Sequence, residues 1–239
     1  MLSTGTRVAV SVAPRRAGEI PSLYSEALGL GADLVEVRLD ALPEGELVEA
    51  PRALSALDCG RILLTYRSPE EGGMGGPPEG PALAAVRRAL EACPGSLLDV
   101  DLSGVERSPE LRELALSRRD LTIASRHYGS AVGLELALSE YEEALRLGRY
   151  AKLVFRASSP RDNLIPLRLY RALGPERLIS FCSGVHGTLS RAMSAVLGAP
   201  IAYASLPGRP VAEGQMPPDE LRELVEELAG LIGGGKRFI

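Results

Sequence analysis

The sequence has few of the residue types that build metal sites, disulfide frameworks and membrane spans. Its 239 residues include two histidines and three cysteines, and no apolar run approaches the ~18 residues of a membrane-spanning helix. His127 and His186 stand in no HxH or HExxH pattern, so we expect no metal site. Cys59, Cys93 and Cys182 lie far apart without CxxC spacing, and we interpret them as reduced, mostly buried thiols of a cytoplasmic protein.

Basic residues also do not outnumber acidic ones in the sequence. The net charge is −4 and the pI is near 5.4, whereas a nucleic-acid-binding protein needs clustered positive charge. The apolar run at residues 8–13 is too short and too interrupted for a signal peptide, so we interpret it as a first strand. The composition therefore predicts a cytoplasmic protein that acts on a small molecule and contacts neither nucleic acid nor membrane.

Lysine, asparagine and glutamine are scarce. The chain has one Asn and one Gln, Asn163 and Gln215, and this scarcity with 18 prolines and abundant Arg resembles a thermostable protein. Its two lysines are Lys236 in the tail and Lys152 inside an apolar run. Arg can replace Lys as a charge but not as a nucleophile. Lys152 is therefore a candidate nucleophile, and the alternative is a strand-end lysine that reaches solvent.

Apolar, β-branched segments alternate with amphipathic segments along the whole chain. We predict strands at residues 7–13, 34–40, 61–67, 96–102, 121–127, 151–157, 177–183 and 201–206, and helices at residues 44–57, 81–93, 109–117, 139–147, 161–173 and 218–232. Eight strand–helix units without a long linker favour a single-domain (β/α)8 TIM barrel over residues 1–239. An open, doubly wound sheet is the alternative, but no GxGxxG follows the first strand.

Two connections have the composition of mobile loops. Residues 71–81 are rich in Gly and Pro and follow the third predicted strand, and residues 207–218 follow the eighth. The second loop carries Gln215, which makes this loop a candidate lid over the barrel.

Charged residues alternate along two of the predicted strands. Glu36, Arg38 and Asp40 share one face of the second strand, and Asp99 and Asp101 share one face of the fourth. Buried charges are costly unless they pair or bind something polar. These residues are therefore either ligand-binding groups or a structural ion-pair network.

One histidine and one arginine lie at or just after the carboxyl ends of strands, where the active-site residues of such barrels are found. His127 ends the fifth strand, which favours a general acid or base. Arg191 lies with Ser190 at the start of the helix after the seventh strand, where backbone N–H groups and the guanidinium would suit a phosphate or a carboxylate. His186 lies in a glycine-containing loop, and we interpret it as structural.

These residues permit carbonyl chemistry through an imine. Lys152 would attack a ketone, the protonated imine would act as an electron sink, and His127 would move a proton on the adjacent carbon. The residues alone leave open a Schiff-base lyase, a class I aldolase, or a catalytically silent barrel that binds a small acid or a partner protein.

Six short motifs in order along the chain resemble those of type I 3-dehydroquinate dehydratases. The motifs are Glu36-Val37-Arg38-Leu39-Asp40, Tyr66-Arg67-Ser68-Pro69-Glu70-Glu71-Gly72-Gly73, His127, Lys152, Ser190-Arg191 and Ala212-Glu213-Gly214-Gln215. The resemblance implies dehydration of 3-dehydroquinate to 3-dehydroshikimate in the shikimate pathway, with no metal or organic cofactor. Members of this family are often dimeric, which makes a homodimer one expected assembly.

The resemblance also implies roles for individual residues. Lys152 would form the imine, His127 would move protons, and Glu71 would orient His127. Arg191 would hold the substrate carboxylate. The remaining positions that match substrate-binding groups are Glu36, Arg38, Arg67 and Gln215, with Asp40 and Asp99 as further acidic candidates.

The chain departs from the family pattern at several positions. Val211 and Glu213 replace a Ser and a Pro of the lid motif, and Arg156 replaces an apolar residue beyond the lysine. The remaining departures are Phe181 and Ser183 where bacterial relatives have Met, and Tyr128 where an Asp is usual. None of these positions is part of the proposed catalytic pair.

Overall fold

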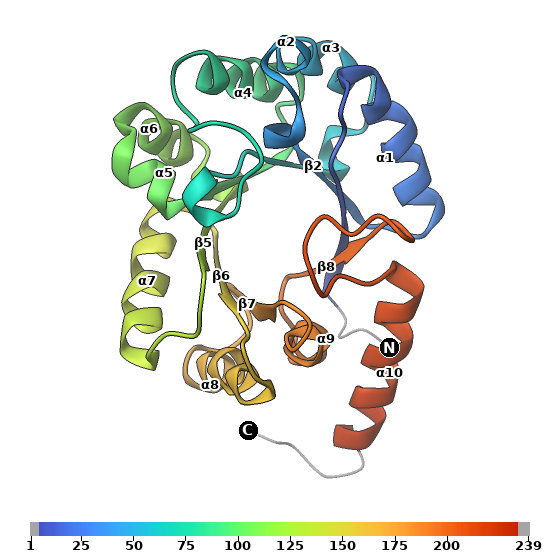
Figure 1. Cartoon of the computed structure of the whole chain (residues 1–239), viewed down its shortest axis with the longest axis vertical. Coiled ribbons are helices and arrows are strands. Elements are labelled where there is room, and N and C mark those ends of the chain that lie inside the picture. Colours follow the sequence, from blue (N-terminus) through green and yellow to red (C-terminus); the bar gives the residue numbers. More distant parts are fainter. Residues whose placement is uncertain (1–4, 234–239) are drawn as a thin grey trace.

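The structure, a computed structural model, describes residues 5–233 and contains eight parallel strands in one sheet, in the order β7-β6-β5-β4-β3-β2-β1-β8. Helices surround the strands, as Figure 1 shows, and the predicted TIM barrel is confirmed. In residues 5–233 no ladder joins β7 to β8, so the barrel is nearly closed by backbone hydrogen bonds. Lys236 lies outside the described residues.

The eight predicted strands are all present, most of them slightly shorter than predicted. The strands are β1 (Arg7–Val12), β2 (Leu34–Arg38), β3 (Ile62–Thr65), β4 (Leu97–Asp101), β5 (Thr122–Tyr128), β6 (Tyr150–Arg156), β7 (Leu178–Ser183) and β8 (Ile201–Ser205). The α-helices are α1 (Ile20–Gly29), α2 (Glu44–Leu47), α3 (Ala50–Leu54), α4 (Gly80–Ala92), α5 (Leu102–Arg107), α6 (Pro109–Ser117), α7 (Leu134–Leu147), α8 (Leu164–Leu173), α9 (Thr188–Val196) and α10 (Pro218–Gly233).

Several strand ends differ from the prediction by one or two residues, and two of these differences have a clear local cause. Asp40 does not continue β2, because residues 39–41 turn into a short 3-10 helix and the Arg38 side chain bonds Asp40. Leu102 begins α5 rather than ending β4, because the Asp101 carboxylate accepts a hydrogen bond from the N–H of Gly104 at 2.7 Å and caps that helix. The predicted helix at 44–57 is two short helices, α2 and α3.

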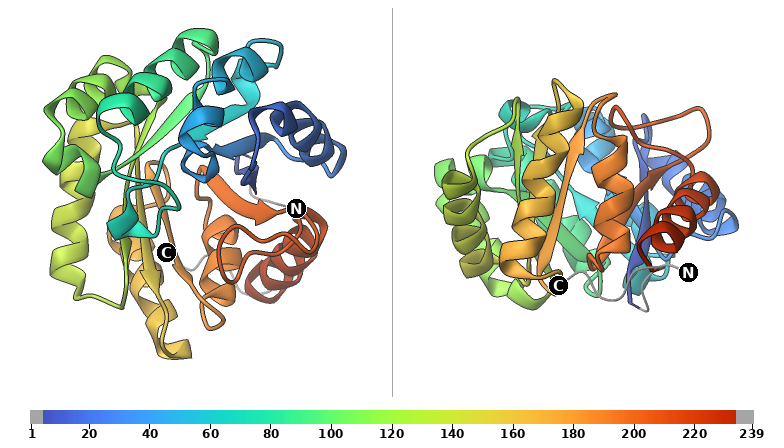
Figure 2. Two further views of the ribbon diagram at one scale, coloured as in Figure 1. Left: turned by 45° about the horizontal axis from the view of Figure 1, so that its top comes forward. Right: turned by 90° about the horizontal axis from the view of Figure 1, so that it is seen from below.

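Successive side chains of each strand point to opposite faces, so the apolar residues form two layers. One layer packs between the strands and the helices and includes Val35, Val37 and Leu64. The other fills the barrel interior with residues from every strand: Ala9, Leu34, Leu63, Leu97, Ile123, Tyr150, Val154, Ile179, Phe181, Ile201 and Tyr203. Polar residues occupy the interior near the carboxyl ends of the strands. Figure 2 shows the long loop between β8 and α10 extending beyond that end of the barrel.

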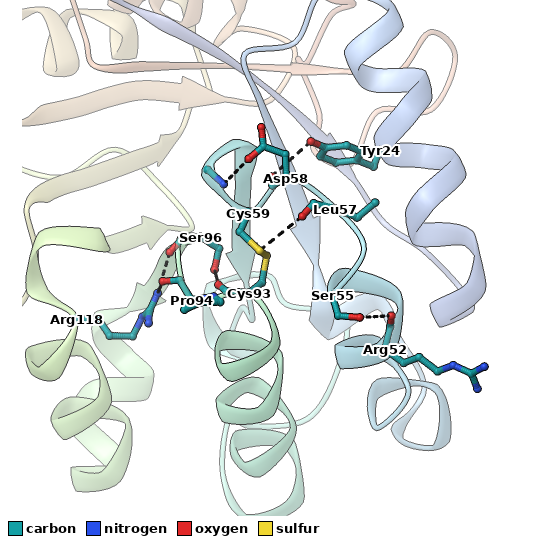
Figure 3. The surroundings of a disulfide bond; sticks show 11 residues. Tyr24, Arg52, Ser55, Leu57, Asp58, Cys59, Cys93, Pro94, Ser96 and Arg118 are labelled. Atoms are coloured by element: carbon teal, nitrogen blue, oxygen red, sulfur yellow. Dashed lines mark hydrogen bonds between the residues drawn. A yellow bond between two sulfur atoms is a disulfide. The ribbon is translucent and has the colours of Figure 1, made fainter.

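Two of the three cysteines form a disulfide, so their interpretation as reduced thiols is wrong. Cys59 lies in a short 3-10 helix before β3 and Cys93 follows α4, and the fold brings their Cα atoms to 5.2 Å (Figure 3). Their 34-residue separation gives no local signal, because the pairing depends on how α4 returns along β3. Cys182 is a free, buried thiol, as predicted.

Candidate active site

One cavity of about 330 Å³ opens at the carboxyl ends of the strands. Among the residues that line it are the predicted groups Glu36, Arg38, Arg67, Glu71, His127, Lys152, Arg191 and Gln215. Asp40 and Asp99 do not line the cavity, although each bonds a residue that does. His186 is exposed on the loop before α9, and its carbonyl accepts a hydrogen bond from Asn163 at 2.6 Å.

Lys152 is buried on β6 with its ammonium inside the barrel. The residue is 3% exposed, so the alternative of a lysine that reaches solvent is wrong. Its Nζ lies 2.9 Å from Asp99 and 3.8 Å from Glu36. Burial lowers the pKa of Lys152, and the nearby charge of Arg67 lowers it further, while Asp99 and Glu36 oppose the shift. The net direction favours the neutral amine that a nucleophile needs.

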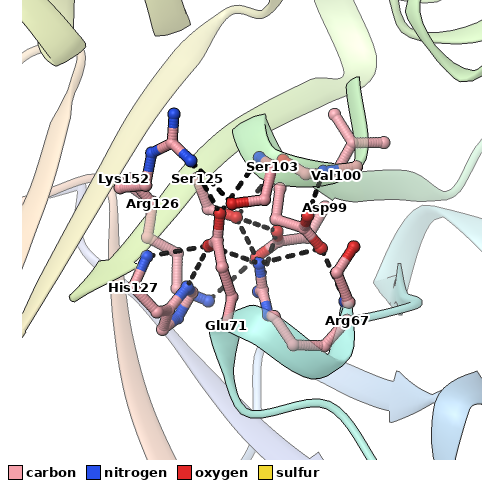
Figure 4. A network of polar contacts seen from close by, with 12 residues as sticks. Arg67, Glu71, Asp99, Val100, Ser103, Ser125, Arg126, His127 and Lys152 are labelled. Atoms are coloured by element: carbon pink, nitrogen blue, oxygen red, sulfur yellow. Dashed lines mark hydrogen bonds and ion pairs between the residues drawn. The ribbon is translucent and has the colours of Figure 1, made fainter. Parts of the chain in front are cut away.

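Asp99 joins Lys152 to a buried arginine. Its second oxygen accepts hydrogen bonds from Arg67 at 2.9 Å and from the Ser125 hydroxyl at 2.6 Å (Figure 4). Burial alone would raise the pKa of Asp99, but the charges of Arg67 and Lys152 outweigh burial and hold it well below its usual range. Asp99 therefore stays ionised beneath the cavity and holds Lys152 from below.

His127 reaches the same cavity from the neighbouring strand. Ser125 pairs in register with Lys152, and His127 is two residues further along β5 on the same face. One oxygen of Glu71 lies 2.8 Å from the backbone nitrogen of His127 and 3.2 Å from its Nδ1. When Nδ1 donates to Glu71, Nε2 keeps its lone pair and can act as a base.

The charge state of His127 suits this role. Burial lowers the pKa of His127 well below its ordinary value, and the positive charges of Arg67 and Lys152 lower it further. The imidazole is therefore neutral near pH 7 and available to accept a proton.

Glu71 is fixed, although we predict it on a mobile loop. It ends a short 3-10 helix (Pro69–Glu71), and its other oxygen accepts a hydrogen bond from the Ser103 N–H at 3.1 Å and lies 3.5 Å from Arg126. The following turn packs tightly, because a Cβ on Gly73 would lie 1.9 Å from the Arg67 carbonyl oxygen. The chain here needs glycine to bring Glu71 within hydrogen-bond distance of the His127 Nδ1.

Gln215 ties the loop after β8 to the barrel. Its Oε1 accepts hydrogen bonds from the N–H groups of Val211 and Ala212 at 2.9 and 3.0 Å, and its Nε2 donates to Ser11 at 3.0 Å. Ser11 donates in turn to Glu36. The single glutamine therefore shapes the loop and connects it to a carboxylate beside Lys152.

Arg38 and Asp40 form a bidentate pair at 2.9 and 2.7 Å. Asp40 also accepts a hydrogen bond from the Met74 N–H at 3.0 Å, so it links Arg38 to the loop after β3. Burial alone would raise the pKa of Asp40, but the hydrogen bonds and charge of Arg38 outweigh burial and lower it. Asp40 thus supports Arg38 from outside the cavity, and Arg38 itself faces the cavity.

Arg191 supplies a cationic group for an anion, whereas the neighbouring Ser190 is engaged elsewhere. The Ser190 N–H donates to Asn163 at 3.1 Å and its hydroxyl accepts from the Cys182 N–H at 2.9 Å, so both are occupied. Arg191 is 2% exposed, and burial lowers its pKa to about 10. In residues 5–233 its guanidinium has no ion-pair partner, which leaves its charge available to a ligand.

Three residues that build the site were not predicted from the sequence. Ser11, Tyr203 and Arg126 were assigned no role, yet Ser11 bonds Glu36, Tyr203 lies under Lys152 and Arg126 contacts Glu71. Ser11 and Tyr203 could have been found from the alternation of side-chain direction along a strand, because this alternation places both on the inner face of their strands. For Arg126 the partners come from three different elements, so no local pattern identifies it.

Residues 5–233 contain no group of three or more His, Cys, Asp or Glu side chains arranged to hold a metal ion. Over the same range, no helix is both long and apolar enough to span a bilayer.

The chain is similar over nearly its whole length to proteins of one family. Residues 8–231 match the family model for type I 3-dehydroquinase. The 3-dehydroquinate dehydratase of Thermococcus gammatolerans is 36% identical over 200 residues, which is 83% of this chain and 89% of that protein. The enzyme of the same name from Methanothermobacter thermautotrophicus is 29% identical over 223 residues, 93% and 97% of the two chains.

Solved structures agree on the fold. The 3-dehydroquinate dehydratase of Geobacillus kaustophilus aligns with a TM-score of 0.78 at 24% identity, covering 98% of this chain and 93% of that one. The enzyme of Aquifex aeolicus aligns with a TM-score of 0.71 at 25% identity, covering 93% and 98%. With the family match over residues 8–231, these findings show that the chain belongs to the type I 3-dehydroquinase family.

Proposed function

We propose that Lys152 and His127 are the catalytic residues with which this chain dehydrates 3-dehydroquinate to 3-dehydroshikimate, the hydro-lyase reaction of its family in the shikimate pathway. The observation that carries the proposal is the position of Lys152. Its amine is buried in a polar cavity beside ionised Asp99, and His127 faces the same cavity from the next strand.

The reaction begins when neutral Lys152 adds to the ring ketone. The carbinolamine takes up one proton, which the final hydrolysis returns, loses its hydroxyl as water and becomes an iminium ion that withdraws electrons from the neighbouring carbon. His127 Nε2 takes a proton from that carbon, and the electron pair moves toward the iminium nitrogen to give an enamine. This sequence needs a neutral imidazole, which the lowered pKa of His127 supplies.

Elimination then follows from the enamine. Its electrons return and expel the hydroxyl group on the β-carbon, which receives the proton held by His127 and leaves as water. Water adds to the conjugated iminium, and hydrolysis releases the enone product and regenerates Lys152. The net change is the loss of one water molecule from the substrate.

The remaining residues of the site are proposed to bind the substrate or to orient the two catalytic residues. Arg191, which has no carboxylate partner within residues 5–233, would hold the substrate carboxylate. Glu71 would hold His127 in the tautomer that leaves Nε2 free, and Asp99 would fix Lys152. The groups proposed to bind the ring hydroxyls or close the lid are Glu36, Arg38, Arg67 and Gln215.

Borohydride trapping tests the proposal. Reduction in the presence of 3-dehydroquinate should attach the ligand skeleton to one lysine, and peptide mapping should place the added mass on Lys152. A sample without 3-dehydroquinate controls for non-specific reduction. Mass added elsewhere, or none at all while the protein forms the enone, would overturn the imine at Lys152.

We also propose that the chain works in the cytoplasm as a homodimer. Its biosynthetic reaction supports the compartment, and the Cys59–Cys93 disulfide is compatible with it because intracellular proteins of hyperthermophiles are often rich in disulfides. The resemblance to a family that is often dimeric supports the assembly. Light scattering should give twice the 25.3 kDa of one chain, and a mass of one chain would overturn the dimer.

A further inference from the structure

Two aromatic side chains lie across the one seam of the barrel that backbone hydrogen bonds do not close. Phe181 on β7 and Tyr203 on β8 have ring centroids 5.9 Å apart and planes tilted by 48°. Both residues are almost fully buried, at 3% and 2% exposure, and both line the cavity. Over residues 5–233 no ladder joins these two strands, so side-chain packing is what spans the seam at this level.

Each ring lies against one cation of the proposed site. The Nζ of Lys152 lies 4.0 Å from the centroid of Tyr203, and the guanidinium carbon of Arg191 lies 4.3 Å from the centroid of Phe181. Both distances are well within the range of a cation–π interaction, which is strongest when the cation is removed from water.

The two cations differ in what else holds them. Lys152 has the carboxylates of Asp99 and Glu36 within 4.0 Å. Arg191 has no ion pair among the described residues, and its Nε has no hydrogen-bond partner there. The face of Phe181 is therefore the contact that fixes the plane of this guanidinium.

We infer that the Phe181–Tyr203 pair, which we name the aromatic seam, positions the imine-forming amine and the carboxylate-binding guanidinium relative to each other. A neutral ring can orient Arg191 without neutralising its charge, whereas a carboxylate partner would compete with the carboxylate of the ligand. The ring of Tyr203 supports the positive charge of the iminium that forms from Lys152. This inference rests on the proposed function.

The ring of Tyr203, not its hydroxyl, carries the effect. Its Oη has no hydrogen-bond partner among the described residues, and burial raises the pKa of the phenol well above its ordinary value. The side chain is therefore a neutral aromatic face under the ammonium. Phenylalanine at this position would present the same face, whereas leucine would not.

The first arm of the test changes Phe181 and compares two substrates. One is 3-dehydroquinate and the other is its methyl ester, which lacks the charge that Arg191 would bind. Phe181→Leu should lower kcat/KM for the acid by about 2- to 30-fold, the range of a cation–π contact, and leave kcat/KM for the ester nearly unchanged. Ile179→Val, deeper on the same strand, is the matched control and should not alter the ratio of acid to ester.

The second arm changes Tyr203 and separates kcat from KM. Tyr203→Leu should lower kcat and the yield of borohydride-trapped imine by about 2- to 30-fold with little change in KM. Tyr203→Phe should restore both quantities. Tyr150→Leu, in the same interior layer but outside the cavity, controls for loss of an aromatic ring from the barrel.

The outcomes separate the aromatic seam from the proposed function. Equal losses for acid and ester in Phe181→Leu, or an unchanged imine yield in Tyr203→Leu, would overturn the seam. Absence of any trapped imine on Lys152 in the unmodified protein would instead overturn the proposed function. If Phe181→Leu does not fold, Phe181→Met also removes the ring, but its unbranched, flexible side chain can adapt to the space left behind, and it is judged by the same acid-to-ester ratio.

Discussion

Arg156 at the end of β6 and Glu213 in the loop after β8 form an ion pair of 3.0 Å across the cavity mouth. The Glu213 carbonyl also accepts a hydrogen bond from the Gly184 N–H at 3.1 Å, so the loop is fastened to two neighbouring strands. Arg156 therefore holds the loop after β8. Arg67 is the arginine whose charge lowers the pKa of Lys152.

Breaking this ion pair should weaken lid closure modestly. Both side chains are about half exposed, and exposed pairs contribute about 0.2–1 kcal/mol, so Glu213→Ala should raise KM by about 1.5- to 5-fold. A double-mutant cycle with Arg156→Ala should give a coupling energy of that size that disappears in 1 M salt. Arg146→Ala, in an exposed pair on α7, serves as control. Additive single losses at low salt would show that the pair does not hold the lid.

Lys152→Arg should abolish turnover and keep the fold. The guanidinium retains the positive charge between Asp99 and Glu36 but cannot form an imine. Enone formation measured by ultraviolet absorbance should fall to background, while circular dichroism should match the unmodified protein. Measurable turnover in a pure sample of this variant is the result that our mechanism does not allow.

The acid limb of the pH–rate profile should lie well below pH 6.5. Burial and the charges of Arg67 and Lys152 lower the pKa of His127. The imidazole therefore stays neutral when the pH falls to the ordinary pKa of a histidine. Activity should be lost only below that lowered pKa, where protonation removes the base. His127→Ala should cost ~10²-fold or more and remove this limb. If the acid limb persists in His127→Ala, the pKa that it reports belongs to another group.

Glu71→Gln should lower kcat more than it changes KM. The carboxylate holds the backbone and the ring of His127, and hydrogen bonds to charged groups contribute about 1.5–3 kcal/mol, which corresponds to about 10- to 160-fold in kcat. Glu106→Gln removes a different, exposed partner of Arg126 and should leave kcat near its original value. An equal loss in both variants would indicate that Arg126, not the orientation of His127, is what matters.

Reduction of the Cys59–Cys93 disulfide should lower thermal stability. Closing a loop of this length stabilises the folded chain by about 3–4 kcal/mol in the chain-entropy model, or roughly 10 °C in Tm for a protein of this size. A scan with dithiothreitol should match the Cys59→Ser, Cys93→Ser double variant, and the reagent should not shift that variant further. Equal Tm values with and without the reagent in the unmodified protein would contradict the prediction.

Most of the barrel could be predicted because its signals are local. Alternating apolar residues identify each strand, and the parallel order brings the strand ends to one side of the barrel. That geometry alone gathers Glu36, Lys152 and His127 at one cavity. Strand order therefore carried most of the information about the site.

The rest depends on contacts between segments distant in sequence. The partner of Cys59 is fixed by the packing of α4, and Asp40 leaves the strand because Arg38 folds back onto it. Tyr203 resembles any other interior apolar residue until Lys152 is found above its ring. No local pattern reports such contacts, because each exists only after the barrel closes.

The disulfide turns residues 59–93 into a covalent ring, and this ring contains Arg67, Glu71 and the Gly- and Pro-rich loop before α4. A protease that cut this loop would break the backbone without releasing either fragment. The pieces before and after the cut would stay joined through sulfur, each still packed in the barrel. The chain can therefore carry its least regular loop beside the active site and survive nicking there as one molecule.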